Sequence, residues 1–273
     1  MNTAVSTAVG TGSIPAFREQ FAAFSKNGGG EGPAWLPALR RRAFDVFTSL
    51  GYPTTRDEDY HYTSVAPIAE TAFRHLSADP GTLTAPLAPS YVIDEDWNRL
   101  VFVNGVFAPS LSRFEQLPDE VEVSTLSSAL ATDASFVESQ LGKLALIDRN
   151  AFAALNTAFV KDGVVIRLPA DCVVERPIHV LWLADEAASG ASLFPRLLLD
   201  AGTHARVAVI ETFAGIGGSG YFTNAVTELR VGAGARVEHY RVQREAADAF
   251  HVSTAQAYQS RDSILHSFSF ATG

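Results

Sequence analysis

A strand–turn–strand unit recurs through the second half of the chain, and it limits the fold more than any other feature. Four segments show it: VVIRLPADCVV, LLLDAGTHARVAV, LRVGAGARVEHY and the more degenerate AYQSRDSILHSFSF. Gly202 and Gly232 lie thirty residues apart in the second and third copies, as do Ala205 and Ala235. Repeats of this length indicate a solenoid, in which each unit covers the apolar face of its neighbour. We expect a parallel β-helix over residues 156–273, with a hairpin-built β-sandwich as the competing fold.

The first half of the chain alternates helical periods with turns, which predicts a largely helical, mixed domain over residues 15–155. Phe17, Phe21 and Phe24 share one helical face. A longer apolar stripe ends at Gly51, the residue type that commonly closes a helix. Residues 1–14 are expected to be disordered.

Two further segments of the first half have a local signature. Asn104-Gly105 stands between two β-prone runs, and this dipeptide takes the positive φ angles of a tight turn, so we expect a hairpin near residues 99–108. A last helix is expected from about Ser135 to Phe159. The stretch NGGGEG at 27–32 is predicted to be a flexible joint.

Composition and charge exclude several classes of protein. A chain of 273 residues that is 47% hydrophobic can bury a large core. A net charge of -9 argues against a nucleic-acid-binding face, which needs clustered Lys and Arg. Signal-peptide features and an apolar run long enough to cross a bilayer are both missing from the sequence, so we expect a cytoplasmic protein without membrane contact.

The glycine-rich stretch VAVIETFAGIGGSG is a weak nucleotide-binding candidate. Gly215, Gly217 and Gly220 have the spacing G-x-G-x-x-G, which in a dinucleotide site must be followed by a helix. Here the β-prone segment YFTNAVTELRV follows instead. We therefore interpret the glycines as a flexible corner between two strands.

The sequence assigns no catalytic, cofactor-binding or metal-binding residue. Cys172 is the only cysteine. A free cysteine is most often a small buried hydrophobe, and acting as a thiolate ligand would require a lowered pKa and access. The seven histidines have no ligand spacing. Glu211 and Glu228 could approach each other across neighbouring coils, which leaves open a carbohydrate-active β-helix enzyme, a polysaccharide lyase or hydrolase, as the alternative function.

Several segments, taken in order, resemble the SufB/SufD family of iron–sulfur cluster assembly scaffolds. They are GPAWLPALRRRAFDVFTSLGYPTTRDEDYHYTSV, LVFVNGVFAPSLS, ALNTAFVKDGVVIRLP, RPIHVLWL and NAVTELRVGAGARVEHYRVQRE. The first is more similar to SufD than to SufB. Together the segments cover nearly the whole chain from about residue 15.

The resemblance implies a right-handed parallel β-helix after a mixed helical region, and a non-catalytic scaffold subunit. Its partners would be a SufB-like subunit and the ABC-type ATPase subunit SufC, with any iron–sulfur cluster held at the level of the complex. Family members continue beyond the segment that resembles QSRDSILHSFSFATG. We therefore expect a C-terminally truncated chain, or one whose last coil needs a partner as a cap.

Overall fold

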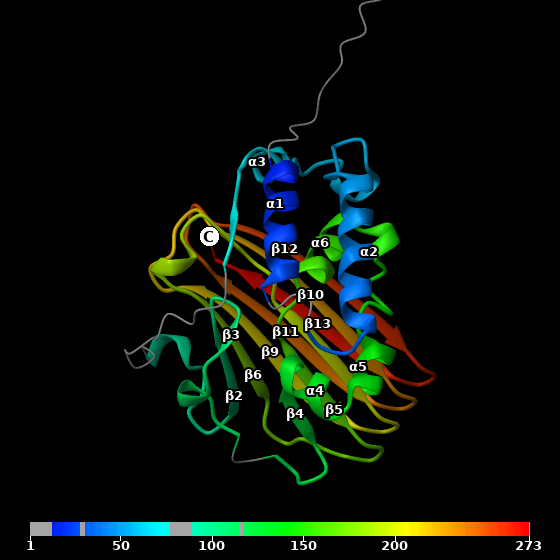
Figure 1. The fold of residues 1–273 in the computed structure, drawn as a ribbon. Helices are drawn as coiled ribbons and strands as arrows, with labels where there is room; N and C mark the ends of the chain where they lie inside the picture. The colour runs from blue at the N-terminus through cyan, green and yellow to red at the C-terminus, as the bar shows by residue number, and fades with distance from the viewer. Residues whose placement is uncertain (1–12, 28–30, 77–88, 115–116, 273) are drawn as a thin grey trace, which may run out of the picture.

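The computed structural model of this chain describes residues 13–27, 31–76, 89–114 and 117–272. A β-solenoid of about four turns forms the larger layer, and the N-terminal helices cover one of its faces (Figure 1). Residues 1–12 of the predicted disordered stretch and residues 28–30 of the predicted joint lie outside the described residues.

The helices all belong to the first 190 residues. The α-helices are α1 (Ser13–Lys26), α2 (Trp35–Leu50), α3 (Ala66–Glu70), α4 (Leu126–Thr132), α5 (Ala134–Gln140) and α6 (Ala151–Phe159). The short 3-10 helices are η1 (Glu58–Tyr60), η2 (Pro89–Tyr91), η3 (Pro109–Leu111), η4 (Ile147–Arg149) and η5 (Glu186–Ala188). Gly51 ends α2 with a φ of 69°, as the sequence predicts.

The single helix predicted from Ser135 to Phe159 is wrong. The chain leaves α5 after Gln140 and takes a φ of 71° at Gly142, a value that favours glycine and that an α-helix cannot contain. A new helix begins at α6, where the Asn150 side chain accepts a hydrogen bond from the Ala153 amide as an N-cap.

The strands form two sheets. Sheet A contains β1 (Arg74–His75), β4 (Glu122–Thr125), β5 (Val164–Leu168), β7 (Ala191–Leu193), β8 (Arg196–Ala201), β10 (Phe222–Val231) and β12 (Phe250–Gln259). Sheet B contains β2 (Asn98–Val103), β3 (Val106–Phe107), β6 (Ile178–Ala184), β9 (Arg206–Gly215), β11 (Arg236–Arg244) and β13 (Ile264–Ala271).

The chain winds alternately through the two sheets, and each coil pairs with the next in parallel. In sheet B, Arg206 pairs with Arg236, which pairs with Ile264, so successive coils are offset by 30 and 28 residues. This confirms the parallel β-helix and the thirty-residue period. The β-sandwich alternative is wrong, because hairpins would make neighbouring strands antiparallel and these coils are parallel.

One corner of the solenoid explains the repeat seen in the sequence. Asp171, His204, Gly234 and Asp262 occupy equivalent places in successive corners, and each has a φ of between 59° and 66°. Asp, His and Gly tolerate this left-handed conformation better than most residues. A Cβ atom at Gly234 would also collide with the His204 ring in the coil below.

The first half of the chain supplies part of the solenoid. β2 pairs in parallel with β6, and β4 pairs in antiparallel with β5. β2 turns into β3 through Asn104 and Gly105, whose φ angles are 52° and 81°, which confirms the predicted hairpin.

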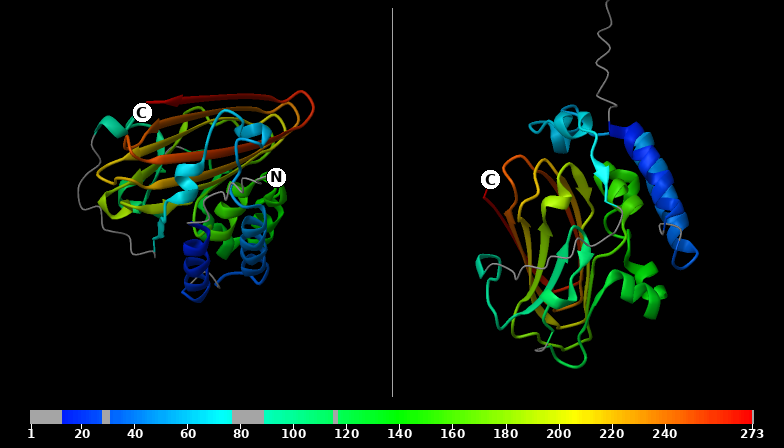
Figure 2. Two further views of the ribbon diagram at one scale, coloured as in Figure 1. Left: turned by 90° about the horizontal axis from the view of Figure 1, so that it is seen from above. Right: turned by 60° about the vertical axis from the view of Figure 1, so that its left-hand side comes forward.

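The core of the solenoid consists of side chains that alternate inward from both sheets. Leu100 and Val180 of sheet B meet Leu199 and Leu229 of sheet A in one buried cluster. Outside sheet A, a second cluster joins the helices to the strands, with Phe17, Phe47 and Phe159 packed near Phe222. Figure 2 shows α1 and α2 on this side of the solenoid, whereas the short helices η2 and η3 lie against sheet B.

Candidate functional site

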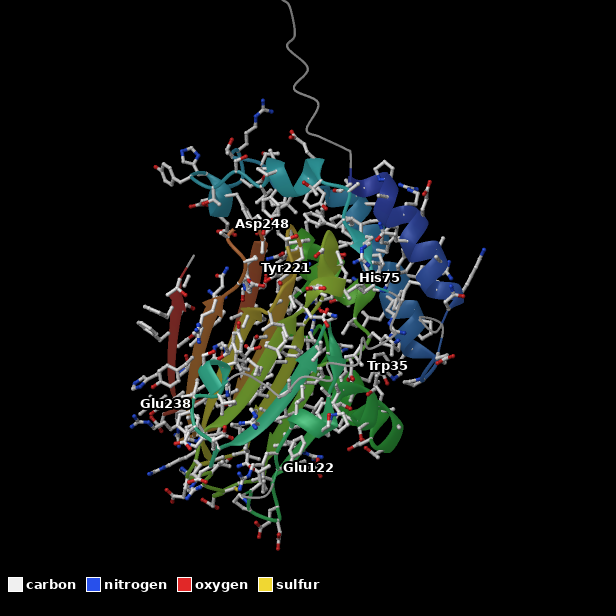
Figure 3. All side chains as sticks on the ribbon, turned by 90° about the vertical axis from the view of Figure 1, so that its left-hand side faces the viewer. Trp35, His75, Glu122, Tyr221, Glu238 and Asp248 are labelled. Carbon is white, nitrogen blue, oxygen red and sulfur yellow. The ribbon has the colours of Figure 1, made fainter. Side chains whose placement is uncertain are left out.

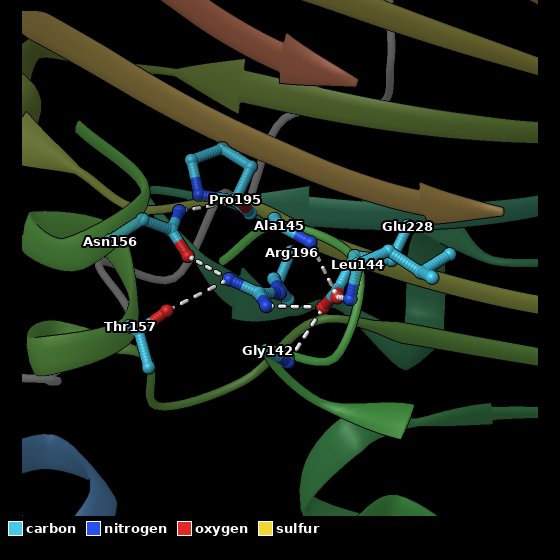
Figure 4. A network of polar contacts seen from close by, with 8 residues as sticks. All are labelled: Gly142, Leu144, Ala145, Asn156, Thr157, Pro195, Arg196 and Glu228. Atoms are coloured by element: carbon cyan, nitrogen blue, oxygen red, sulfur yellow. Dashed lines mark hydrogen bonds and ion pairs between the residues drawn. The ribbon is translucent and has the colours of Figure 1, made fainter. Parts of the chain in front are cut away.

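A buried ion pair lies where the helical region meets sheet A. Arg196 of β8 and Glu228 of β10 project outward from the sheet, and their side chains are 0% and 3% exposed. The guanidinium forms an ion pair with the Glu228 carboxylate and donates to Asn156 Oδ1 at 3.0 Å and Thr157 Oγ1 at 3.2 Å (Figure 4). We call these four residues the polar joint.

Glu228 also holds the irregular segment that separates α5 from α6. Its carboxylate accepts hydrogen bonds from the backbone amides of Gly142, Leu144 and Ala145 at 2.7–3.0 Å. Burial alone would raise the pKa of Glu228, but Arg196 and the three amides outweigh it and lower the pKa below its ordinary value. Glu228 is therefore ionised, and its charge is fully compensated.

Asn156 connects α6 to β10 and to the residue that precedes β8. Its amide nitrogen donates to the carbonyls of Pro195 at 2.9 Å and Asn224 at 2.8 Å, and Asn224 in turn donates to the Phe152 carbonyl. Because every one of these groups is buried, losing any of them would leave an uncompensated partner. The polar joint therefore positions the N-terminal region on the solenoid.

A second polar cluster lies inside the solenoid. Glu211 of β9 accepts hydrogen bonds from Trp182 Nε1 at 3.1 Å, Thr227 Oγ1 at 2.7 Å and His239 Nε2 at 2.9 Å. Burial would raise the pKa of Glu211, but the His239 contact and the other donors lower it. Glu211 thus connects three successive coils through one carboxylate.

A further carboxylate–imidazole pair lies near the end of β11. Glu245 contacts His251 Nδ1 at 2.7 Å and accepts from Thr223 Oγ1 at 2.6 Å, and the His251 ring stands edge-on to Phe213. The described part of the chain contains no group of three or more His, Cys, Asp or Glu side chains arranged to hold a metal ion.

Glu211 and Glu228 do not converge as the acidic residues of a glycosidase or lyase would. Glu211 projects from β9 of sheet B into the interior of the solenoid. Glu228 projects from β10 of sheet A to the outside, so sheet A lies between the two carboxylates. Each is buried and saturated with donors from the chain itself. Asp57, Glu58 and Asp59 are exposed at the start of the short helix η1. Glu211 and Glu228 therefore do not form the paired carboxylates that such an enzyme presents in an open cleft.

Cys172 lies at a corner of the solenoid, half-buried against the main core cluster. Burial, followed by the charge of Glu120, raises the pKa of its thiol. A raised pKa disfavours the thiolate that metal binding or sulfur transfer needs. The environment of Cys172 therefore matches that of a small hydrophobe.

The glycine-rich stretch is a corner between β9 and β10, as predicted. Gly217 and Gly220 have φ angles of 126° and 56°. A Cβ atom at Gly218 would approach the Asp185 carbonyl to 2.6 Å. The glycines are therefore required by backbone conformation and close packing rather than by flexibility.

The outer face of sheet B is covered along only part of its length. Tyr91, Ala108 and Leu111 pack on Val101 and Leu181 in the early coils. In the last two coils the apolar side chains on the outer side of sheet B are at least partly exposed, and we call this set the β11–β13 face: Tyr240, Val242, Ile264, Phe268 and Phe270. The ion pair of Arg236 and Glu238 lies on the same side of β11. Phe268 is 59% exposed and Phe270 is 53% exposed. Such an apolar patch is typical of an interaction surface.

Comparison with known proteins identifies the family. The family model for the SufBD protein N-terminal region matches residues 17–180. The model for the SUF system FeS cluster assembly, SufBD core domain, matches residues 183–273. The chain belongs to the SufBD family. The resemblance noted from the sequence is thereby confirmed.

Curated relatives agree with this assignment. An iron–sulfur cluster assembly SufBD family protein of Synechocystis is 31% identical over 83% of this chain and 52% of its own length. Iron–sulfur cluster assembly protein SufD of Escherichia coli is 23% identical over 82% of the chain and 50% of its own length. SufD of Bacillus subtilis is 22% identical over 85% and 54%. The chain spans about half the length of the curated relatives it matches.

The polar joint of this SufBD protein was not recognised from the sequence. Asn156 and Arg196 lie within the apolar runs ALNTAFV and FPRLLL, and a polar residue inside such a run is the signal that could have identified them. Among the described residues, no helix combines the length and hydropathy needed to cross a membrane.

Proposed function

We propose that this chain is a non-catalytic scaffold subunit of a Suf-type iron–sulfur cluster assembly complex. In this proposal it pairs with a SufB-like subunit, and both bind an ABC-type ATPase subunit in the cytoplasm. The cluster is the cargo of the whole complex. The match of both family models along nearly the entire chain carries the proposal.

The distribution of polar groups supports a scaffold role. The buried carboxylates of Glu211, Glu228 and Glu245 are each occupied by donors from the chain itself. Such groups stabilise the stacking of coils and the position of the helices, and they are not presented to a substrate. The ATPase activity of the complex would belong to the partner.

We further propose that the β11–β13 face receives the SufB-like subunit. Its exposed aromatic side chains are the type that dominates binding energy at protein interfaces. They also project outward from sheet B, away from the helical region. Figure 3 shows Glu238, on the same outward side of β11, far from Trp35 of the helical layer.

Co-purification tests the proposal. The chain is co-expressed with a SufB-like subunit and an ABC-type ATPase subunit, and a tag on the chain is used to recover the complex. We expect all three to co-purify, and we expect Phe268→Ser with Phe270→Ser to release the SufB-like subunit. Recovery of the chain alone, with no bound subunit in either form, would contradict the proposal.

A further inference from the structure

The β2–β3 hairpin contains a dipeptide with a chemical reactivity of its own, and the proposed assembly role does not use it. In Asn-Gly, the backbone nitrogen of the glycine can attack the side-chain amide carbon of the asparagine, because glycine has no side chain to hinder the approach. The sequence contains this dipeptide twice, at Asn27-Gly28 and at Asn104-Gly105. The second forms the turn between β2 and β3.

Neighbouring segments do not shield Gly105. A Cβ atom at this position would meet none of the described residues within 4 Å, apart from its neighbours in the chain. Asn104 and Gly105 are both only half-buried. The reactivity of the dipeptide therefore depends on where the Asn104 amide group is held.

Asp185, the residue after β6, holds the Asn104 amide group at both of its polar atoms. Asn104 Nδ2 donates to Asp185 Oδ1 at 2.6 Å, and the Asp185 backbone amide donates to Asn104 Oδ1 at 3.1 Å. The Asn104 backbone amide also donates to the Leu183 carbonyl at 2.8 Å, which fixes the turn against the end of β6. We call Asn104 and Asp185 the turn clamp.

The turn clamp is anchored by the short helix η5. Asp185 Oδ1 accepts a hydrogen bond from the Ala187 amide at 2.8 Å as the N-cap of this helix. Arg74 donates to the carbonyls of Ala187 and Ser189. Because these contacts hold Asp185 in place, the amide carbon of Asn104 can reach bonding distance of the Gly105 nitrogen only when the hydrogen bonds of the clamp break.

We propose that Asn104 is a deamidation site that the turn clamp keeps unreacted in the folded chain. In the reaction, the Gly105 nitrogen forms a bond to Asn104 Cγ and the bond from Cγ to Nδ2 breaks. The proton of the glycine amide leaves with Nδ2 as ammonia. Water then opens the cyclic imide at either of its carbonyls, which leaves aspartate or isoaspartate at this position.

Deamidation would be irreversible and would destroy the clamp. The aspartate product has no N–H to donate to Asp185, and it places a second negative charge beside the first. Isoaspartate also lengthens the backbone of the turn by one carbon atom. Ala108 and Leu111, which follow the hairpin, pack on Val101 of β2. Loss of the turn would therefore loosen the cover of sheet B in its early coils.

Asn27 provides a reference within the same chain. It is also followed by glycine, its side chain is exposed, and that side chain forms no hydrogen bond with the described residues. Trypsin places the two asparagines in separate peptides, residues 27–40 and 100–113. The rate of deamidation at each site can therefore be compared between the folded and the urea-unfolded chain by mass spectrometry of these peptides.

We expect folding to protect only Asn104. The ratio of the folded rate to the unfolded rate should be close to one at Asn27. At Asn104 it should be lower by about tenfold or more, because two hydrogen bonds must break before the attack. Incubation in mildly alkaline buffer, followed by peptide mapping, measures both ratios in one sample.

Matched aspartate variants separate the clamp from the turn itself. Asp185→Ala keeps the turn residues but removes the acceptor of Asn104 Nδ2, so it should raise the folded rate at Asn104 about tenfold and leave Asn27 unchanged. Asp185→Asn retains a side-chain oxygen acceptor and should keep Asn104 slow. Asp45→Ala, which removes an exposed carboxylate from α2, should change neither rate.

Two results would overturn the proposal. One is an equal ratio of folded to unfolded rate at Asn27 and Asn104 in the parent chain. The other is a rate at Asn104 in Asp185→Ala that equals or falls below that of the parent chain, since Asp185 would then have no effect or would promote the reaction. Circular dichroism confirms that each variant is folded. The comparison of the two sites in the parent chain needs no variant, and it stands if Asp185→Ala does not fold.

Discussion

The outer face of sheet A and the β11–β13 face of sheet B are two surfaces of one solenoid, yet the chain covers only the first. On sheet A, the helices bury both apolar residues such as Phe222 and charged residues such as Arg196. On the last coils of sheet B, Phe268 and Phe270 remain exposed. The difference separates a surface that completes the fold from one that receives a partner in the proposed assembly.

The chemistry of the two surfaces differs accordingly. The covered face depends on a buried ion pair, whose charges are compensated by each other and by hydrogen bonds to Asn156, Thr157 and the amides that contact Glu228. The exposed face combines apolar side chains such as Phe268 with a partly exposed ion pair, Arg236 with Glu238. Substitutions on the covered face should therefore affect folding, and those on the exposed face should affect assembly.

The largest effect is expected at the polar joint. Arg196→Met leaves Glu228 buried without its cation and should lower the free energy of unfolding by about 3–5 kcal/mol. The matched control is Arg42→Met, which removes the exposed ion pair with Asp148 and should cost less than about 1 kcal/mol. Urea unfolding followed by circular dichroism measures both. Equal losses in the two variants would show that the joint does not hold the helices.

A smaller loss is expected inside the solenoid, beneath both surfaces. Glu211→Gln keeps the shape of the side chain but replaces one acceptor with a donor, so at least one of the three groups around it loses its partner. We expect the free energy of unfolding to fall by about 1–3 kcal/mol. The stacking of coils would not depend on this cluster if the variant unfolded at the same urea concentration as the parent chain.

Acid should weaken the covered face in particular. The pKa of Glu228 is lower in the folded chain than its ordinary value of 4.5. The ionised pair is therefore fully stabilising above that ordinary value, and its contribution is lost as the pH falls through the folded pKa. Relative to Glu228→Gln, the parent chain should lose more of its free energy of unfolding on acidification. Parallel pH profiles of the two unfolding free energies would contradict this.

The smallest effect on stability is expected on the exposed face. Phe268→Ser with Phe270→Ser should change the free energy of unfolding by no more than about 0.5 kcal/mol, because both side chains are already more than half exposed. Binding of a SufB-like subunit should nevertheless be lost. If these substitutions destabilised the chain as much as Arg196→Met, the face would belong to the fold rather than to an interface.

Local and periodic features were predictable from the sequence. The thirty-residue repeat predicted equivalent corners in successive coils. His204 and Gly234 lie in such corners and share a positive φ angle. The turn at Asn104-Gly105 was predictable because these two residue types adopt positive φ angles whatever the rest of the chain does. The strand corner at GIGGSG was also predictable, since the segment after it lacks a helical pattern.

Features that depend on contacts distant in sequence were not predictable. The break between α5 and α6 depends on Glu228, whose carboxylate binds amides more than eighty residues earlier in the chain. The sequence also could not tell that Glu211 and Glu228 point to opposite sides of the solenoid wall, because that depends on the register of β9 and β10. Glu211 and Glu228 therefore do not form the carboxylate pair that the sequence left open.

Hydrogen–deuterium exchange tests the contrast between the two faces most directly. Exchange is measured on the chain alone and on the chain mixed with a SufB-like subunit and an ABC-type ATPase subunit. We predict that the partners slow exchange in β11 and β13, while β8 and β10, already covered by the helices, exchange as before. Slowed exchange confined to α1 and α2, with β11 and β13 unchanged, would contradict the account.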